Sequence, residues 1–410
     1  MNKNIKILMY TQMLTVIGSF MLNFSLVYWI YVQYSDAYIL SIYNLMFIIP
    51  LIIVSPFSGY LIDIISAKKM LYISEFGEIV ASILLLTMFL FAATNIYVIF
   101  VAAIIISITE SFRFPSYSVL VSHFVNKSQY RIVHGYYMLS ISIPGIVGPL
   151  FAPHFIKLFG FEGVILFNII TLLFSILLIR KINYEEKTKK LNFVMKLSVF
   201  KEIKRTFFGV FLKKKVLLML SVSAICIFIF NMLRVLVPVF FISLNNQKPY
   251  LYSNAEFIMG TATFLGALIV TLNKKNPDSF FVSFLKSVFC MSMLVLLLGV
   301  SSSYIFWYVL LFLYIVLNQF ADSNAQANWQ TIIDIEHQGF VFGMKKTVIW
   351  FFGAMGTATA GKVMDIMKNY DYTVTQNINI ILRNSGFVSL IVLTFIYVIY
   401  IRLFRKDGDI

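Results

Sequence analysis

The sequence predicts an all-α membrane protein with twelve transmembrane helices, arranged as two pseudo-symmetric six-helix bundles. Of its 410 residues, 60% are hydrophobic and only 12% are charged, whereas a soluble protein carries roughly 25% charged residues. Apolar runs of about 20 residues recur along the chain, and each is long enough to cross about 30 Å of hydrocarbon as a helix. The second half of the sequence also repeats features of the first half.

The apolar runs define twelve expected spans. They cover residues 7–33, 38–58, 70–92, 97–122, 135–157, 163–180, 216–243, 251–272, 280–300, 304–329, 345–367 and 380–402. The first run is too long for a cleaved signal peptide and has no small-residue cleavage site, so we interpret it as the first span.

The net charge of +15 is explained by membrane topology. Basic residues gather in alternate joints between the spans and in the segment 181–215, as the positive-inside rule requires. We therefore expect a multi-pass cell-membrane protein with both termini in the cytoplasm, and no nucleic-acid partner. The four tryptophans are interpreted as anchors at the membrane interface: Trp29, Trp307, Trp329 and Trp350.

The chain divides at its long basic segment. We expect an N-terminal bundle at 1–180, a cytoplasmic linker at 181–215 and a C-terminal bundle at 216–410. The linker mixes apolar and basic residues, which favours an amphipathic helix lying on the membrane surface. A disordered linker is the alternative.

An internal repeat relates the two halves. The stretch from His134 to Pro149 aligns with that from Phe342 to Thr357 at an offset of 208 residues. Six plus six spans repeated in the same sense, joined by a long segment, are typical of a transporter with parallel repeats.

The polar segment 59–71 separates the second and third spans. It contains an expected tight turn with Gly59 and one acid, Asp63, followed by the pair Lys68 and Lys69. A second copy at 266–275 keeps the lysines and lacks the acid.

These motifs resemble the major facilitator superfamily over essentially the whole chain. Gly59, Asp63, Lys68 and Lys69 match its loop motif between spans two and three. Gly145, Gly148 and Pro149 resemble its fifth-span antiporter motif. Features around Phe114–Ser118 and Gly339–Gly343 resemble the macrolide and multidrug efflux branch. The resemblance implies that the 59–71 residues form a conformational latch and that the fifth-span motif packs between the bundles.

In that superfamily, spans one, four, seven and ten line the central cavity. The resemblance therefore places there the polar residues of the fourth, seventh and tenth spans: Glu110, Arg113, Asn231, Arg234, Asn318 and Asp322. We expect them to serve proton coupling and substrate binding.

Glu110 and Arg113 are three residues apart and share one helix face. They form either a proton-titrating site or a static ion pair. Asp322 lies in a polar stripe that is poorly suited to face lipid, and it is the second proton or substrate candidate. Arg234 is expected either to receive an anionic substrate group or to pair with Asp322.

Two further acids, Glu75 and Glu78, lie in the third span, where acids are costly. We expect them to pair with Arg113 or with the lysines of the 59–71 segment. Polar residues of the first span recur at helical spacing, and they either line the cavity or bond to other helices: Gln12, Thr15, Ser19 and Asn23.

No catalytic or cofactor site is expected. The two cysteines and four histidines show no metal-ligand spacing. The stretch Gly356–Lys362 resembles a phosphate-binding loop, but Val363 replaces the required Ser or Thr and the stretch lies inside an apolar span. An enzyme activity and ATP-driven transport by this chain are therefore not expected.

The sequence thus predicts a monomeric secondary transporter that exports a small amphiphilic organic molecule by proton antiport. Alternatives are a dedicated exporter of a secreted metabolite such as a siderophore, a lysolipid flippase of the same fold, and a membrane sensor without transport.

Overall fold

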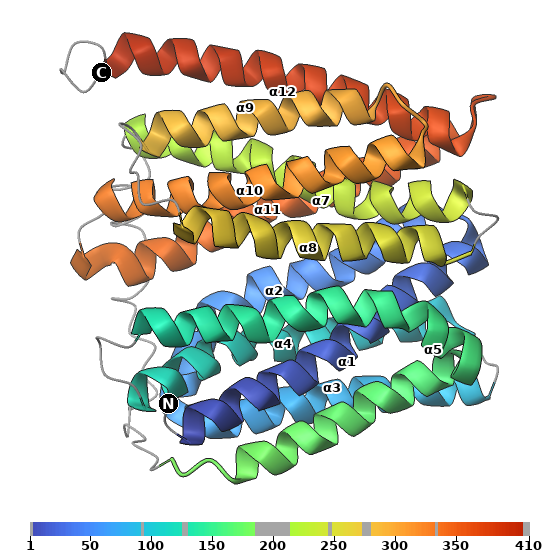
Figure 1. Ribbon diagram of the computed structural model, residues 1–410, viewed down its shortest axis with the longest axis vertical. Helices are drawn as coiled ribbons and strands as arrows, with labels where there is room; N and C mark the ends of the chain where they lie inside the picture. The colour runs from blue at the N-terminus through green and yellow to red at the C-terminus, as the bar shows by residue number, and fades with distance from the viewer. Residues whose placement is uncertain are drawn as a thin grey trace. The chain divides into compact units, whose positions relative to one another are not determined.

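The computed structural model describes residues 3–91, 94–124, 130–184, 214–244, 248–272, 280–332 and 335–404. In these ranges the regular structure is helical (Figure 1). The eleven helices are α1 (Lys3–Tyr34), α2 (Ala37–Ile65), α3 (Ala67–Leu90), α4 (Ile96–Phe124), α5 (Tyr130–Arg180), α7 (Lys214–Leu244), α8 (Tyr250–Leu272), α9 (Phe280–Leu298), α10 (Tyr304–Ile332), α11 (Ile335–Met367) and α12 (Val374–Phe404).

Over the described residues, ten of these helices are long and apolar enough to cross a membrane, and α11 does not meet this criterion there. Large apolar side chains lie exposed on them, including Phe76, Leu173 and Phe395. Such exposure is expected where a helix faces lipid rather than water. The chain is therefore a multi-pass membrane protein.

The chain groups into two compact units. The first combines Met1–Asn192 with Leu244–Gly260, and the second combines Phe193–Ser243 with Thr261–Ile410. Helices α1 to α5 thus belong to the first unit, together with the first half of α8. Residues 185–213 lie outside the described residues, so the predicted linker helix and the boundaries at 180 and 215 stay predictions.

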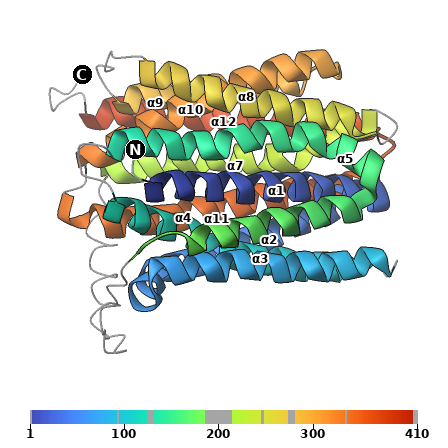
Figure 2. The ribbon, with the colours of Figure 1, turned by 60° about the horizontal axis from the view of Figure 1, so that its bottom comes forward.

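Helix α5 replaces the two separate spans expected at 135–157 and 163–180. It is assigned as one 51-residue helix, and its backbone leaves helical geometry at Gly160, with φ 70° and ψ −175°. Figures 1 and 2 show that the chain turns there and that the second arm runs back with α1 between the two arms. A positive φ favours glycine, because it has no Cβ to clash.

The sequence predicts the turn between α2 and α3 at Gly59 and Asp63, and this prediction is wrong. Both residues continue α2, and the chain turns at Ser66, with φ 89° and ψ 143°. The Ser66 backbone N–H donates to the Ile62 carbonyl at 3.0 Å, and its hydroxyl accepts from the Lys69 N–H at 3.4 Å. One serine thus ends α2 and caps α3.

Helix α1 occupies the core of the first unit and packs mainly along α5. Gly148 of α5 lies against α1: a Cβ at this position would meet the Phe20 Cβ at 3.0 Å and the Ile17 carbonyl at 3.4 Å. A larger side chain would hold the helices apart. Phe24 of α1 also stacks on Tyr252 of α8, with ring centroids 4.8 Å apart.

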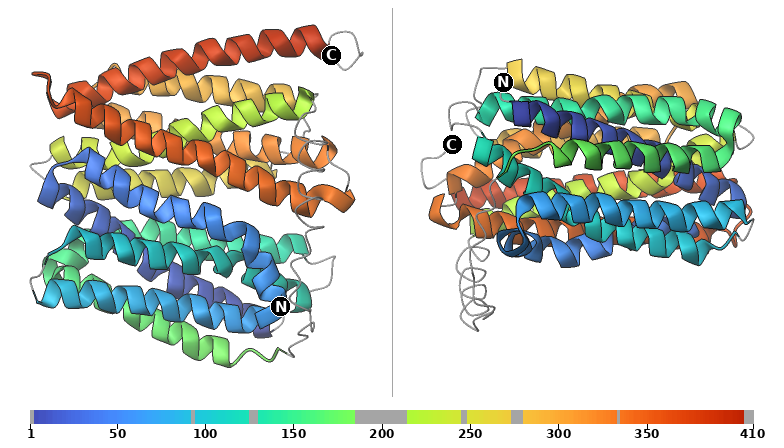
Figure 3. Two further views of the ribbon diagram at one scale, coloured as in Figure 1. Left: turned by 180° about the vertical axis from the view of Figure 1, so that it is seen from behind. Right: turned by 90° about the horizontal axis from the view of Figure 1, so that it is seen from below.

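Three of the four tryptophans expected to anchor the membrane interface are buried among the helices. Trp29 is 8% exposed, and Trp307 and Trp329 are fully buried. Within the second unit, Trp307 of α10 stacks on Phe240 of α7 at 3.6 Å between ring centroids, with the planes 5° apart. Their large apolar rings fill the unit's core. The helices of each unit run alongside one another when viewed from behind and from below (Figure 3).

Candidate functional site

An ionic cluster lies inside the first unit, between α3 and α4. It consists of Arg113, Glu75, Glu78 and Glu110, and we call it the Arg113 cluster. Arg113 Nη1 donates to Glu110 Oε2, and Nη2 donates to Glu78 Oε2. The third carboxyl, that of Glu75, has its Oε1 3.9 Å from Arg113 Nε.

Most of this cluster is sealed from solvent. Glu75 and Glu78 are each 1% exposed and Arg113 is 3% exposed, whereas the Glu110 side chain is 37% exposed. Removing one partner from a buried ion pair costs about 3–5 kcal/mol, because the other charge is left uncompensated. The buried members therefore depend on one another energetically.

Helix α1 supplies hydroxyl groups to the same acids. Thr15 Oγ1 lies 3.0 and 2.9 Å from the two carboxyl oxygens of Glu75 and 3.0 Å from Ser175 Oγ on α5. Ser19 donates to Glu78 Oε1 at 2.5 Å. For Thr15 and Ser19, these contacts confirm that the polar face of α1 bonds to other helices, and they tie α1, α3 and α5 together.

The expected pairing of Glu75 and Glu78 with Arg113 is confirmed. The Glu110–Arg113 pair is also formed, but it is one part of a larger group. Sequence spacing could identify only this local pair, because Glu75 and Glu78 come from another helix. The available signal was the need of buried acids for a cation.

The second unit carries a polar group on α10. The Asn318 amide donates to Asp322 Oδ2 at 3.3 Å, and the Cys226 thiol of α7 lies 3.6 Å from Asn318 Oδ1. Lys345 of α11 interacts electrostatically with Asp322 and donates to Gln326 at 3.3 Å. Asp322 is exposed, so it can meet water or a solute.

The two predicted residues of α7 differ in their surroundings. Asn231 is fully buried, and its amide donates to the Ile227 carbonyl one turn earlier at 2.9 Å. Arg234 is exposed, although residues 235–242 that follow it are all buried. Among the described residues Arg234 forms no ion pair, so the expected bridge to Asp322 is absent there.

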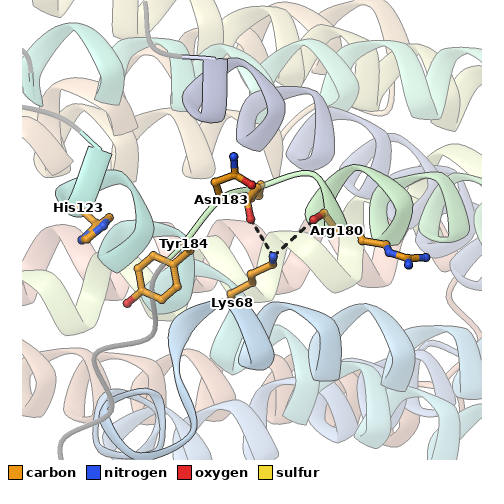
Figure 4. Close-up of a pocket in the computed structure, with 6 residues that line it drawn as sticks. Lys68, His123, Arg180, Asn183 and Tyr184 are labelled. Carbon is orange, nitrogen blue, oxygen red and sulfur yellow. Dashed lines mark hydrogen bonds between the residues drawn. The ribbon is translucent and has the colours of Figure 1, made fainter.

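At the end of the 59–71 segment, Lys68 ties the start of α3 to the end of α5. Its ammonium donates to the carbonyls of Ile182 at 2.7 Å and Arg180 at 3.5 Å. Figure 4 shows this contact, with the Arg180 guanidinium pointing away from Lys68. A cation at the carboxyl end of a helix satisfies otherwise unpaired carbonyl groups.

These groups border a pocket of about 510 Å³. It is lined by Lys68, His123, Arg180, Ile182, Asn183 and Tyr184. Lys69 is exposed, and the side chains of Gly59 and Asp63 lie outside the described residues, so their latch role stays a prediction.

The fifth-span motif contacts α1 and α8. Gly145 lies near the Phe20 ring, and the Pro149 carbonyl accepts a hydrogen bond from the Ser253 hydroxyl at 2.8 Å. Both contacts lie within the first unit, and the predicted packing between the bundles stays a prediction. Among the described residues, no group of three His, Cys, Asp or Glu side chains is placed to hold a metal ion.

Comparison with known proteins gives the family. The family model described as the Major Facilitator Superfamily matches residues 8–358. The chain belongs to the major facilitator superfamily. A search of curated proteins with this transporter's sequence found no match.

Solved structures show the same fold. The transporter resembles a mutant of the nucleoside transporter NupG with a TM-score of 0.76 and 14% identity, covering 96% of this chain and 100% of that one. It resembles a D-xylose-proton symporter with a TM-score of 0.71 and 12% identity, covering 96% of each chain. For a mutant of the peptide transporter POT, the TM-score is 0.72 and the identity 13%, covering 98% of this chain and 95% of that one. At these identities the likeness concerns the fold alone.

Proposed function

We propose that this transporter exports a small amphiphilic organic molecule by proton antiport. The Arg113 cluster carries the proposal. Ionisable groups inside membrane spans are costly, and they commonly mark ion or proton pathways. Three carboxyl groups around one guanidinium can exchange a proton while the cation remains in place.

The proposed architecture has twelve spans in two six-helix bundles. The two arms of α5 on either side of Gly160 supply the fifth and sixth spans, and α11 supplies the eleventh. In this arrangement the two bundles rock about a central substrate site. Both termini lie in the cytoplasm, and the functional unit is a monomer in the cell membrane.

The proposed cycle couples the two units through charge. A carboxyl group, Glu110 or Asp322, takes a proton from outside, which weakens its interaction with a nearby cation. Substrate leaves to the outside, and the bundles then rock so that the central site opens to the inside. The proton is released there. Differential affinity of the two states for the proton drives the change. The latch residues Gly59, Asp63, Lys68 and Lys69 hold one state, and Gly145, Gly148 and Pro149 form the packing surface.

Proteoliposomes with a pH-sensitive dye test the coupling. Adding a transported amphiphilic cation should move protons in the opposite direction through the wild type. The double variant Glu110→Gln, Asp322→Asn should lose this movement. Asp365→Asn is the control, because Asp365 pairs with Lys362 at 3.3 Å on the exposed end of α11. Full activity in the double variant, or no proton movement in the wild type, contradicts the proposal.

A dedicated exporter of an anionic or zwitterionic metabolite is the second candidate. The exposed Arg234, which forms no ion pair with the other described residues, lies in a buried stretch of α7 and favours it, since a guanidinium binds carboxylate groups well. Drug-susceptibility testing of a deletion strain distinguishes the two candidates. Increased susceptibility to several unrelated drugs supports multidrug export. Unchanged susceptibility with loss of one metabolite from the culture medium supports the dedicated exporter.

A further inference from the structure

Glu75 differs from the other acids of the Arg113 cluster because the guanidinium does not hydrogen-bond to it. Nη1 and Nη2 of Arg113 donate to Glu110 and Glu78, respectively. The 3.9 Å between Arg113 Nε and Glu75 Oε1 is too long for a hydrogen bond. Within the described residues, this buried Nε has no hydrogen-bond partner. A donor near Glu75 is thus unused.

Charge balance calls for a proton in this cluster. One guanidinium and three carboxylates would carry a net charge of −2. The exposed fraction of Glu110, 37% of its side chain, lets water stabilise its charge. Glu75 and Glu78 are each 1% exposed, and an uncompensated carboxylate in such a place is strongly unfavourable. Because Glu78 is hydrogen-bonded to Arg113 and Glu75 lies 3.9 Å from it, Glu75 is the buried acid with the weaker compensation.

The hydroxyl groups beside Glu75 suit both protonation states. Thr15 lies within 3.0 Å of both Glu75 and Ser175, but a hydroxyl has only one hydrogen to donate. If Glu75 is protonated, it donates to Thr15, which donates to Ser175. If Glu75 is ionised, Ser175 donates to Thr15, which donates to Glu75. The direction of the hydrogen bonds that link Glu75, Thr15 and Ser175 therefore depends on whether Glu75 holds the proton.

We propose that Glu75 is the proton-binding carboxyl of this transporter, with Thr15 and Ser175 as its positioning residues. This assignment rests on the proposed proton coupling and adds to it a buried site on α3, with Glu110 as the exposed carboxyl through which the proton exchanges. When the proton leaves, the O–H bond breaks, its electron pair stays on the Glu75 carboxylate, and the proton passes by way of Glu110 to water. Glu75 then closes the gap to Arg113 Nε and competes with Glu78 and Glu110 for the guanidinium.

Four ionisable groups face Glu75 or its partners from the surrounding helices. Arg113 and Glu110 come from α4, and Glu78 comes from α3. Tyr137 of α5 interacts electrostatically with Glu110 and Arg113. Deprotonation of Glu75 therefore changes the charge balance around the Arg113 guanidinium, and the rearrangement reaches Glu110 at the exposed edge.

Infrared difference spectroscopy of the purified, reconstituted protein at neutral pH tests the assignment. A protonated carboxyl gives a C=O stretching band that an ionised one lacks. We expect Glu75→Gln to lose one such band and Glu110→Gln to keep it. The amide of Glu75→Gln can donate to Thr15 as the acid does, so the variant should fold. A band kept in Glu75→Gln, or lost in Glu78→Gln instead, overturns the proposal.

Thr15→Val provides a second route if Glu75→Gln does not fold. It removes the acceptor beside the acid, so the same band should shift in frequency, and an unshifted band overturns the proposal.

Proton movement in proteoliposomes distinguishes a failure of this proposal from a failure of the proposed proton antiport. No substrate-linked movement in the wild type refutes the function, whatever the spectra show. Movement that persists in Glu75→Gln refutes the role of Glu75 and leaves the function intact.

Discussion

Replacing Glu78 by Gln should destabilise the protein to an extent that depends on pH. The change removes the carboxylate that is hydrogen-bonded to Arg113 Nη2, in a pair whose side chains are 3% and 1% exposed. At low pH, Glu75 is neutral and cannot replace Glu78. The loss should then approach the cost of breaking a buried ion pair, about 3–5 kcal/mol.

The loss should become smaller as the pH rises. In the variant, Glu75 is the other buried acid within reach of Arg113, at 3.9 Å from Nε. Its ionisation restores a buried pair, which leaves mainly the cost of rearranged hydrogen bonds, about 1–3 kcal/mol. The stability loss decreases with rising pH because Glu75 can compensate Arg113 only after it has lost its proton.

Thermal unfolding in detergent, followed by tryptophan fluorescence at one scan rate, measures the effect. The difference in Tm between Glu78→Gln and wild type should shrink with increasing pH. In the double variant Glu75→Gln, Glu78→Gln, the Tm difference from wild type should no longer shrink with increasing pH. Glu110→Gln is the matched control, and its loss should stay below about 1 kcal/mol because that pair is partly solvated. A Tm difference that is constant with pH would refute the reasoning.

Three further predictions concern packing, capping and transport. Gly148→Leu should cost about 1–3 kcal/mol by overpacking and lower the Tm, because its side chain would press on Phe20. A Cβ at Gly145 would lie 3.4 Å from the Phe20 ring, so Gly145→Ala should leave the Tm nearly unchanged. An equal loss of Tm in the two variants would contradict this account. Lys68→Met removes the donor to the end of α5 and should cost about 1 kcal/mol. Faster limited proteolysis just after α5 would show it, and wild-type cleavage rates would argue against the cap. Asp322→Asn should keep the Tm, because the side chain is exposed, yet slow transport in proteoliposomes by about tenfold or more, the equivalent of one charge-assisted interaction. Unchanged transport would exclude Asp322 from the cycle.

The membrane helices could be predicted because hydropathy depends on local composition. The predicted span at 97–122 became α4 at Ile96–Phe124, and that at 251–272 became α8 at Tyr250–Leu272. The turns were harder to place. Gly59 resembled a turn residue, yet the chain turns at Ser66, because a single positive φ there suffices. At Gly160 one non-helical residue replaced an expected five-residue joint.

The site could be predicted in part, because the cost of buried acids already indicated that Glu75 and Glu78 need a cation such as Arg113. Glu110 and Arg113 share a face at three-residue spacing, so their pairing follows from helical geometry. The positions of Glu75, Thr15 and Ser175 depend on how α3, α1 and α5 pack, and no local pattern records that packing. The burial of three tryptophans was not predicted, for a related reason. An indole suits both a membrane interface and a helical core, and tertiary packing decided the matter for Trp307.

The fold-back at Gly160 restricts what this position tolerates. One residue in non-helical geometry joins the two arms of α5, so no loop residues are available to absorb a distortion there. Any residue with a Cβ would have to adopt the positive φ of 70°, which is unfavourable, and its Cβ would meet Glu162 Oε2 at 2.5 Å. The direction of the second arm of α5 therefore depends on a single glycine.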